Sequence, residues 1–466
     1  MSILAAAIMP HPPLLIPSVG HGEEETIYAT REACRKAADF LLEQKPDVIL
    51  VTSPHTTLYG DFFHISPGLW AEGSFAAFGA PQEKMVCRYD DELAETVEKL
   101  AAEEQFPAGT MGQKDPSLDH ATMVPLSFFG DALKDVKIVR IGLSGLSLKD
   151  HYHLGQLLAK AVEKLGRRAV FLASGDLSHK LKKDGPYGFA PEGPEYDCKL
   201  MDAMKKADFG ALFGFPELLL DEAAECGHRS FTIMAGAFDG KDVKAGNLSY
   251  EGPFGVGYGV ATFLPEGDNP ERRFAEKYDD IRKEMRDRQR AEEDIYVQVA
   301  RAIVERFVRL GTMPIIPKEL KEKMPREMTA KKAGAFVTLH KNGSLRGCIG
   351  TMGPVQDSIA DEIRHNAVSA CSRDPRFTPV TPDELEDLVY SVDVLGELEQ
   401  ITSIDQLDPH EYGVLVSKGS RSGVLLPNLP GIDTVEQQLE IACQKGGIRP
   451  EEGDLFVQRF RVVRHT

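Results

Sequence analysis

The sequence ILAAAIMPH, residues 3–11, decides how the first part of the chain folds. It is a short apolar run that ends in a proline and a histidine, and VILVTSPH at residues 48–55 repeats this pattern. A third run, AVFLASGDLSH, covers residues 169–179. Continuous apolar runs of this length are typical of strands that are buried on both faces of a sheet. We therefore predict an α/β domain in which polar residues follow the ends of several strands.

Longer helical patterns separate these runs and complete the first domain. Residues 26–43 and 91–103 have the apolar spacing of helices that cover a sheet, and another strand is expected over residues 136–143. The glycine-rich stretch at residues 250–263 is consistent with a closing strand. We predict a central, mostly parallel or mixed sheet flanked by helices, which spans residues 1–265.

The composition changes after residue 265. Residues 266–290 are dense in charges of both signs and poor in apolar residues, which indicates a charged, solvated linker or an exposed helix. An amphipathic helical pattern resumes at residues 291–310, and short strand-like runs mix with helical ones from residue 334 onward. The sequence thus predicts a second, smaller α+β domain over residues 291–466.

Charge and cysteine content exclude several classes of protein. The 466 residues contain 54 Lys and Arg against 72 Asp and Glu, a net charge of −18, which argues against a general nucleic-acid binder. The seven cysteines form no CxxC pair, so neither a zinc ribbon nor a secreted disulfide framework is indicated. The apolar start lacks the charged region of a signal peptide, and no run reaches the roughly 18 apolar residues of a membrane span. We expect a cytoplasmic protein that binds neither nucleic acid nor membrane.

Four histidines of the first domain share one kind of position. His11, His55 and His179 each follow a predicted strand, and His120 precedes an apolar run in Asp119-His120-Ala121. Sites in open α/β sheets gather beyond the carboxyl ends of the strands, so these side chains can converge although they are far apart in sequence. Neutral imidazole is a common ligand of iron, zinc and copper. The alternative for each histidine is a capping or partly buried polar side chain.

PHPPLLIP, a strand running into SPH, LDHATMVPL and SGDLSH occur in that order in the first domain. Together they resemble the LigB-type class III extradiol dioxygenases and the related Memo proteins. The resemblance implies that His11 and His55 hold a non-haem Fe(II), and that His179 acts as an acid and base. It also implies that His120 lies beside a small, catechol-like aromatic substrate that reacts with O₂, and that the protein is a homo-oligomer. Asp176 could orient His179.

The third metal ligand is expected in the segment AAECGHRSF, residues 223–231. This segment resembles the stretch that supplies a carboxylate in the dioxygenases and a cysteine in the Memo proteins. Glu225 would complete a face of two histidines and one carboxylate, and we favour it. Cys226 is the alternative, and it would suit zinc, copper or redox chemistry. Glu251 is an outside candidate, and for it we favour a role in lining the pocket or in the structure.

The second domain contains three unusual strings. LRGCIG, SACSRDPRF and GVLLP resemble the AMMECR domain over residues 291–466. The resemblance implies a fold more readily than a reaction. Fusion of the two modules resembles a bacterial system in which both accompany a radical SAM protein, and it implies such a protein as a partner.

Cys348 is the candidate catalytic residue of the second domain. It follows Arg346 and Gly347, and glycines allow a ligand to approach the backbone closely. A neighbouring arginine would lower the pKa of the thiol and help to bind an anion. The alternative is a small buried cysteine, with Arg346 and Asp374 as structural partners.

The sequence as a whole favours an Fe(II)-dependent, extradiol-type dioxygenase that acts on a small aromatic substrate. One alternative is a Memo-like protein that handles a metal or a redox reaction without ring cleavage, with zinc or copper as the ion. Another is an interaction protein without catalytic activity.

Overall fold

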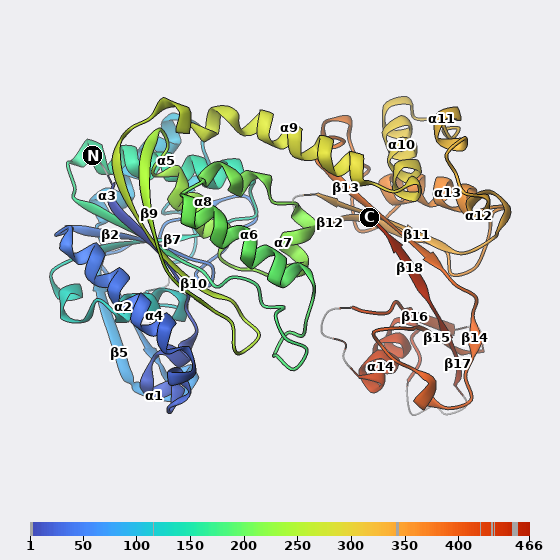
Figure 1. Cartoon of the computed structure of the whole chain (residues 1–466), viewed down its shortest axis with the longest axis horizontal. Coiled ribbons are helices and arrows are strands. Elements are labelled where there is room, and N and C mark those ends of the chain that lie inside the picture. The colour runs from blue at the N-terminus through green and yellow to red at the C-terminus, as the bar shows by residue number, and fades with distance from the viewer. Residues whose placement is uncertain are drawn as a thin grey trace. The chain divides into compact units, whose positions relative to one another are not determined.

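The computed structural model describes residues 3–114, 116–341, 344–419, 421–429, 432, 434–449 and 455–466. Contacts between residues divide the chain into two units, residues 1–285 and 286–466. Figure 1 shows the helices and strands of each unit.

A six-stranded mixed sheet forms the centre of the first unit, in the order β7-β2-β8-β1-β10-β9. Strands β7, β2, β8 and β1 are parallel, whereas β10 and β9 form an antiparallel hairpin beside β1. The strands are β1 (Ile3–Met9), β2 (Val48–Ser53), β7 (Lys137–Gly142), β8 (Ala169–Ser174), β9 (Lys241–Glu251) and β10 (Tyr258–Asp268). This confirms the predicted mixed α/β class.

Helices cover both faces of this sheet (Figure 1). The helices of the unit are α1 (Pro17–Gly20), α2 (Tyr28–Glu43), α3 (Asp91–Glu103), α4 (His120–Ser127), α5 (Leu148–Leu165), α6 (Glu192–Lys206), α7 (Glu217–Ala223) and α8 (His228–Gly236). Alternate residues of β1 enter opposite cores: Ala6 and Ile8 belong to the core that includes residues of α3 and α5, and Ala7 and Met9 belong to the core that includes residues of α2 and α4. Burial on both faces explains why the strands are continuously apolar.

Short strands extend the first unit beyond the main sheet. They are β3 (Phe63–His64), β4 (Trp70–Phe75), β5 (Ala80–Arg88) and β6 (Ala108–Gly109). Strands β4 and β5 pair as an antiparallel ribbon, and β3 pairs with β6. We did not predict this ribbon from the sequence.

The predicted linker, residues 266–290, contains the end of β10 and most of helix α9 (Phe274–Glu292). Arg282 of α9 is buried and forms an ion pair with Glu217 of α7 at 3.2 Å. The segment is therefore mainly a helix, which was one of the two alternatives, and Arg282 is its buried, paired charge.

The second unit contains two four-stranded sheets, in the orders β12-β11-β13-β18 and β14-β17-β15-β16. Its strands are β11 (Ala335–Lys341), β12 (Ser344–Gly350), β13 (Leu388–Leu395), β14 (Glu399–Gln400), β15 (Gly413–Lys418), β16 (Arg421–Leu425), β17 (Phe456–Phe460) and β18 (Val462–His465). Its helices are α10 (Ile295–Leu310), α11 (Lys318–Lys321), α12 (Arg326–Ala330), α13 (Ile359–Ser372) and α14 (Val435–Lys445). The unit is smaller than the first and mixes helices with strands, as predicted for an α+β domain. No helix in the part of the chain that the structure describes is both long and apolar enough to cross a membrane.

Candidate functional site

The strand order of the first unit brings the predicted histidines together. Strand β8 lies between β2 and β1, and all three strands are parallel, so their carboxyl ends adjoin at one edge of the sheet. His11 and His55 each stand two residues beyond the end of their strand. Their ring centroids are 5.0 Å apart, and the ring of His120 stacks on that of His55 at 4.5 Å.

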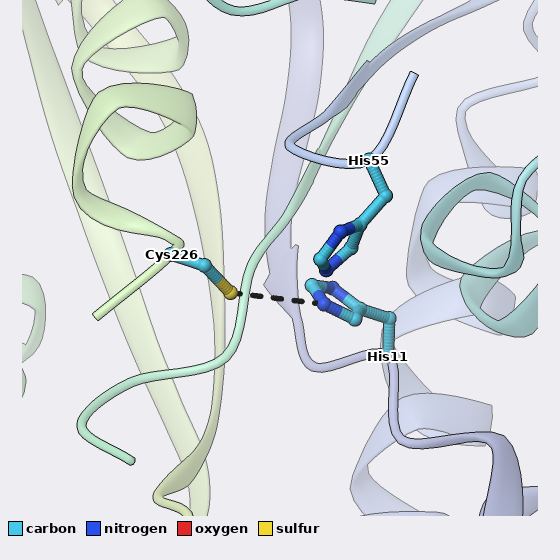
Figure 2. A group of neighbouring side chains, drawn as sticks. All are labelled: His11, His55 and Cys226. Carbon is cyan, nitrogen blue, oxygen red and sulfur yellow. Dashed lines mark hydrogen bonds between the residues drawn. The ribbon is translucent and has the colours of Figure 1, made fainter. Parts of the chain in front are cut away.

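Two of these histidines form a candidate metal centre with a cysteine. One ligand atom each from His11, His55 and Cys226 lies within 4.8 Å of the other two. Figure 2 shows that the sulfur of Cys226 points toward the ring of His11, and its distance from Nε2 is 3.7 Å. A spacing of this size allows small movements of the side chains to bring all three atoms onto one ion. The three side chains come from the ends of β1 and β2 and from the turn before α8.

Ser174 fixes the ring of His11. The Ser174 hydroxyl donates its hydrogen to the carbonyl oxygen of Ala121 at 2.6 Å, so it accepts from Nδ1 of His11 at 3.0 Å. Nδ1 therefore carries the hydrogen, and Nε2 presents its lone pair toward His55 and Cys226. Burial, followed by the neighbouring histidines, lowers the pKa of His11 well below its usual value, which favours the neutral ring.

Asp119 positions the elements that carry His55 and His120. Its carboxylate is the N-cap of α4, accepting from the backbone N–H of Thr122 at 2.9 Å, and it also accepts from the Ser53 hydroxyl at 2.6 Å. One side chain thus ties the end of β2 to the start of α4. The Asp-His pair of the sequence motif therefore combines a structural cap with a residue of the site.

Glu225, which the sequence analysis favours as the third ligand, lies outside the group of ligand atoms. Its carboxylate accepts from the backbone N–H of His228 at 2.6 Å. Helix α8 needs this acceptor because its N-cap is Gly227, which has no side chain to offer. Cys226, the alternative, is the residue that faces His11, so the structure does not support the preference for Glu225. Burial raises the pKa of Glu225 to about 7.

Two other candidate carboxylates accept hydrogen bonds from neighbouring residues of the chain. Asp176 was expected to orient His179, but its Oδ1 accepts from the backbone N–H of His11 at 2.8 Å, and its Oδ2 lies 3.8 Å from Nε2 of that histidine. Burial raises the pKa of Asp176 to about 7. Glu251 accepts from both the backbone N–H and the hydroxyl of Thr30, at 2.7 and 2.6 Å, and is thereby a structural residue.

A pocket of about 770 Å³ opens at the histidines. His11, His55, His120 and His179 line it. Aromatic side chains form part of its wall, namely those of Phe78, Tyr187, Phe254 and Tyr258. The pocket therefore combines ring nitrogens with apolar, planar surfaces, which is the usual construction of a small-molecule site.

Two of these aromatic residues contact the histidines, and sequence reasoning did not find them. The ring of Phe78 packs edge-on against His120 at 5.3 Å, and that of Tyr187 packs edge-on against His179 at 5.1 Å. Phe78 belongs to the turn between β4 and β5, and Tyr187 belongs to an excursion after β8. Each is followed by a glycine with positive φ, which marks a tight turn, but nothing in the sequence shows where the turn is directed.

The second unit places Cys348 on β12, where the surrounding groups bind one another. The thiol sulfur accepts from the Thr338 hydroxyl at 3.2 Å, and the backbone N–H of Cys348 donates to Asp374 at 2.8 Å. Arg346, which we expected to activate the thiol, forms two hydrogen bonds of 2.9 Å with Glu384. These contacts favour the structural alternative for Cys348.

Gly347 serves packing as well. A Cβ atom at this position would lie 2.3 Å from the carbonyl oxygen of Ala370, so the glycine lets β12 approach helix α13. The sequence suggested that a ligand approaches the backbone at Gly347, but helix α13 of the chain itself occupies that space.

Two family models match separate parts of the chain. A family model described as the catalytic LigB subunit of aromatic ring-opening dioxygenase matches residues 5–261, and the AMMECR1 model matches residues 297–465. A protein of Clostridium acetobutylicum is 40% identical to this chain over 100% of its length and 99% of the relative. A protein of Thermotoga maritima is 50% identical over 36% of this chain and 96% of the relative. The crystal structure of an uncharacterized protein from Pyrococcus horikoshii is 31% identical over 36% of this chain and 88% of its own, with a TM-score of 0.33.

The first match covers more than half of the chain and includes all four histidines together with Cys226. The chain therefore belongs to the family of the catalytic LigB subunit of aromatic ring-opening dioxygenases, and an AMMECR1 domain follows this part of it.

Proposed function

We propose that the first unit is a metal-dependent dioxygenase that opens the ring of a small, catechol-like substrate with O₂. The observation that carries this proposal is the convergence of four histidines in one pocket with aromatic walls. In such a reaction a carbon–carbon bond of the ring breaks and both atoms of O₂ enter the product. The electron balance therefore closes between the substrate and O₂, and no other reductant is required.

The donor set suits a metal ion. Two imidazoles and one thiol are ligands that iron, zinc and copper accept, whereas magnesium and calcium prefer oxygen. His11, His55 and Cys226 would hold the ion, and we propose Fe(II) as the native metal. When bound, the ion supplies Lewis acidity and one-electron redox chemistry.

The remaining polar residues have separate tasks in this proposal. His179 accepts a proton from a substrate hydroxyl and returns it during ring opening. Burial lowers the pKa of His179 below its usual value, which keeps the ring neutral and ready to accept that proton near pH 7. His120 donates or accepts a hydrogen bond beside the ring. The walls at Phe78 and Tyr187 exclude water and align a planar substrate.

The test is oxygen uptake by the full chain, purified without oxygen, reconstituted with one equivalent of Fe(II) and exposed to a panel of catechols. We expect uptake that matches the amount of ring-opened product. His179→Gln should lower kcat at least about a hundredfold, since general acid–base catalysis contributes that much. His153→Gln is the matched control, because His153 pairs with Glu104 at the surface of the first unit. Full iron binding without oxygen uptake would contradict the proposal.

One observation favours a second candidate function. The ligand set contains the sulfur of Cys226 and not the carboxylate of Glu225, and a softer set suits zinc or copper as well as iron. The second candidate is a protein that handles a metal or a redox reaction without ring cleavage. Metal analysis of the protein as purified distinguishes the two, since copper or zinc at one equivalent, with no oxygen uptake after iron loading, would favour the second.

Homo-oligomer formation and a radical SAM protein as partner stay predictions. A mass measurement in solution tests the first, and co-purification from the native organism tests the second.

A further inference from the structure

The glycine-rich start of β10, VGYGV at residues 256–260, directs one tyrosine into the pocket. A Cβ atom at Gly257 would lie 2.1 Å from Oδ2 of Asp197, and one at Gly259 would lie 2.6 Å from the sulfur of Met201. Helix α6 therefore packs directly against the two glycines. Because side chains alternate along a strand, Tyr258 between them faces the opposite side.

Tyr258 lies beside the candidate metal centre on that opposite side. It lines the pocket together with His11, although only 3% of its surface is exposed. Strand β1 pairs with β10 so that Ile8 is opposite Ala261. The end of β1, which His11 follows by two residues, therefore lies beside the first half of β10, where Tyr258 is the first residue.

The hydroxyl of Tyr258 has no hydrogen-bond partner among the residues that the structure describes. Tyr152, another buried tyrosine of the first unit, differs, since its hydroxyl donates to Asp239 at 2.7 Å. A buried hydroxyl without a partner is costly, and the cost disappears when a ligand supplies an acceptor. The Tyr258 hydroxyl is not sealed in the core either, because it is not one of the wholly buried atoms that lack a partner in the described chain.

This hydroxyl is suited to donate a hydrogen bond. Burial raises the pKa of Tyr258 above its usual value, and the nearby Asp176 and Tyr187 raise it further. The group therefore keeps its proton at neutral pH, and it presents an uncharged O–H to the pocket.

We propose that Tyr258 contacts the substrate, its hydroxyl donating a hydrogen bond to an oxygen substituent of the aromatic ring. The inference rests on the proposed function, which supplies an oxygen-bearing aromatic ligand. It adds to His120 and His179 a third polar contact, one that arrives on the antiparallel strand and not at the end of a parallel strand. Tyr258 thereby selects ring substrates that carry an acceptor facing β10.

The test is the affinity of 4-nitrocatechol, followed by its change in visible absorption, for the full chain reconstituted with Fe(II) in the absence of oxygen. We expect Tyr258→Phe to weaken binding about fivefold to thirtyfold, the loss that one hydrogen bond predicts. Iron content and the midpoint of thermal unfolding should stay unchanged, because the hydroxyl has no partner in the protein.

Tyr390→Phe is the matched control. Tyr390 is equally buried, but it belongs to the second unit, and its hydroxyl is sealed without a partner. We expect 4-nitrocatechol to bind this variant as it binds the original protein. Affinity of Tyr258→Phe within twofold of the original would overturn the inference alone. Failure of the original, iron-loaded protein to bind the probe would overturn both the inference and the proposed function.

Discussion

The histidine pocket of the first unit and the surroundings of Cys348 in the second unit differ in whether their polar side chains already have partners. In the first unit, four histidines line a pocket whose walls are partly aromatic, and the sulfur of Cys226 lies close to two of them, His11 and His55. In the second unit, the arginines of the LRGCIG and DPRF strings are paired within the unit, Arg346 with Glu384 and Arg376 with Asp374. Both sets of residues are unusual in sequence, but only the first leaves donor atoms directed at open space. Unusual residues indicate a ligand site only where the fold does not satisfy them internally.

Several carboxyl groups of the two units also differ in the direction in which their pKa is shifted. In the first unit, burial raises the pKa of Asp197 to about 7, as it does for Asp176 and Glu225. In the second unit, hydrogen bonds from Arg346 lower the pKa of Glu384 to about 2, and those from Arg376 lower that of Asp374. These three carboxyl groups of the first unit thus resist ionisation, whereas Glu384 and Asp374 of the second unit are ionised and paired with arginines.

The largest expected effect is the loss of metal binding when a histidine of the first site is removed. His55→Ala should abolish stoichiometric Fe(II) binding and leave the fold intact, because it removes one of three ligands from a partly exposed loop position. Metal analysis after gel filtration, with circular dichroism as the check on folding, measures both. His340→Ala, a histidine of β11 in the second unit, is the control. Unchanged iron content in the His55 variant would contradict the assignment of the first site as a metal centre.

Variants of Cys226 and its neighbour Glu225 test which of the two residues is the third metal ligand. Cys226→Ser should weaken metal affinity about tenfold to a hundredfold, since a hydroxyl is a poorer ligand than a thiolate. Glu225→Gln should leave the affinity unchanged, because the amide oxygen can still accept from His228 and cap α8. Competition with a chelator measures the two affinities. The reverse ranking would restore Glu225 as the third ligand.

Much of this site could be predicted from the sequence because the strands are strongly patterned. The runs at residues 3–9 and 48–52 agree with β1 and β2 to within one residue, and the histidine after each is thereby fixed at the edge of the sheet. The order of the strands could not be predicted, and it is this order that makes the histidines neighbours.

The choice between Glu225 and Cys226 depends on a short turn. Two adjacent residues of a turn point in different directions, and a composition-based argument cannot tell which of them faces the metal. A signal was present, however, since a helix that begins after Gly227 lacks an N-cap side chain and a glutamate nearby can supply the acceptor. Phe78, Tyr187 and Tyr258 were missed because long-range packing decides which way they point.

The raised and lowered pKa values predict opposite effects of pH on the two units. Asp197 keeps its proton in the folded state up to about pH 7, whereas the unfolded chain loses it near its ordinary value of 3.8. The folded state then binds more protons between these values, so stability falls as pH rises from about 4 to 7. Asp197→Asn should remove this loss. Its free energy of unfolding, compared with that of the original protein, should rise by roughly 1–3 kcal/mol between pH 4.5 and pH 7.5.

Glu384 has the opposite sign. Its folded pKa of about 2 lies below the ordinary value of 4.5, so its contribution to stability is present above pH 4.5 and is lost as pH falls toward 2. Glu384→Gln should cost roughly 1–2 kcal/mol at pH 7 and less at pH 3. Hydrogen exchange of peptides from each unit of the full chain reports the two effects separately. Parallel pH dependence in both units would contradict the division.

The smallest expected effect concerns Cys348. Cys348→Ala should lower the free energy of unfolding by less than about 1 kcal/mol, because sulfur is a weak acceptor for the Thr338 hydroxyl. Gly347→Ala, one residue away, should cost roughly 2 kcal/mol or more, because its new Cβ would press on the Ala370 carbonyl. Alkylation by iodoacetamide at pH 7 completes the test, with the exposed Cys198 of the same chain as the internal reference. If Cys348 reacted faster than Cys198, its thiol would be activated, and the second unit would contain a reactive site as the first does.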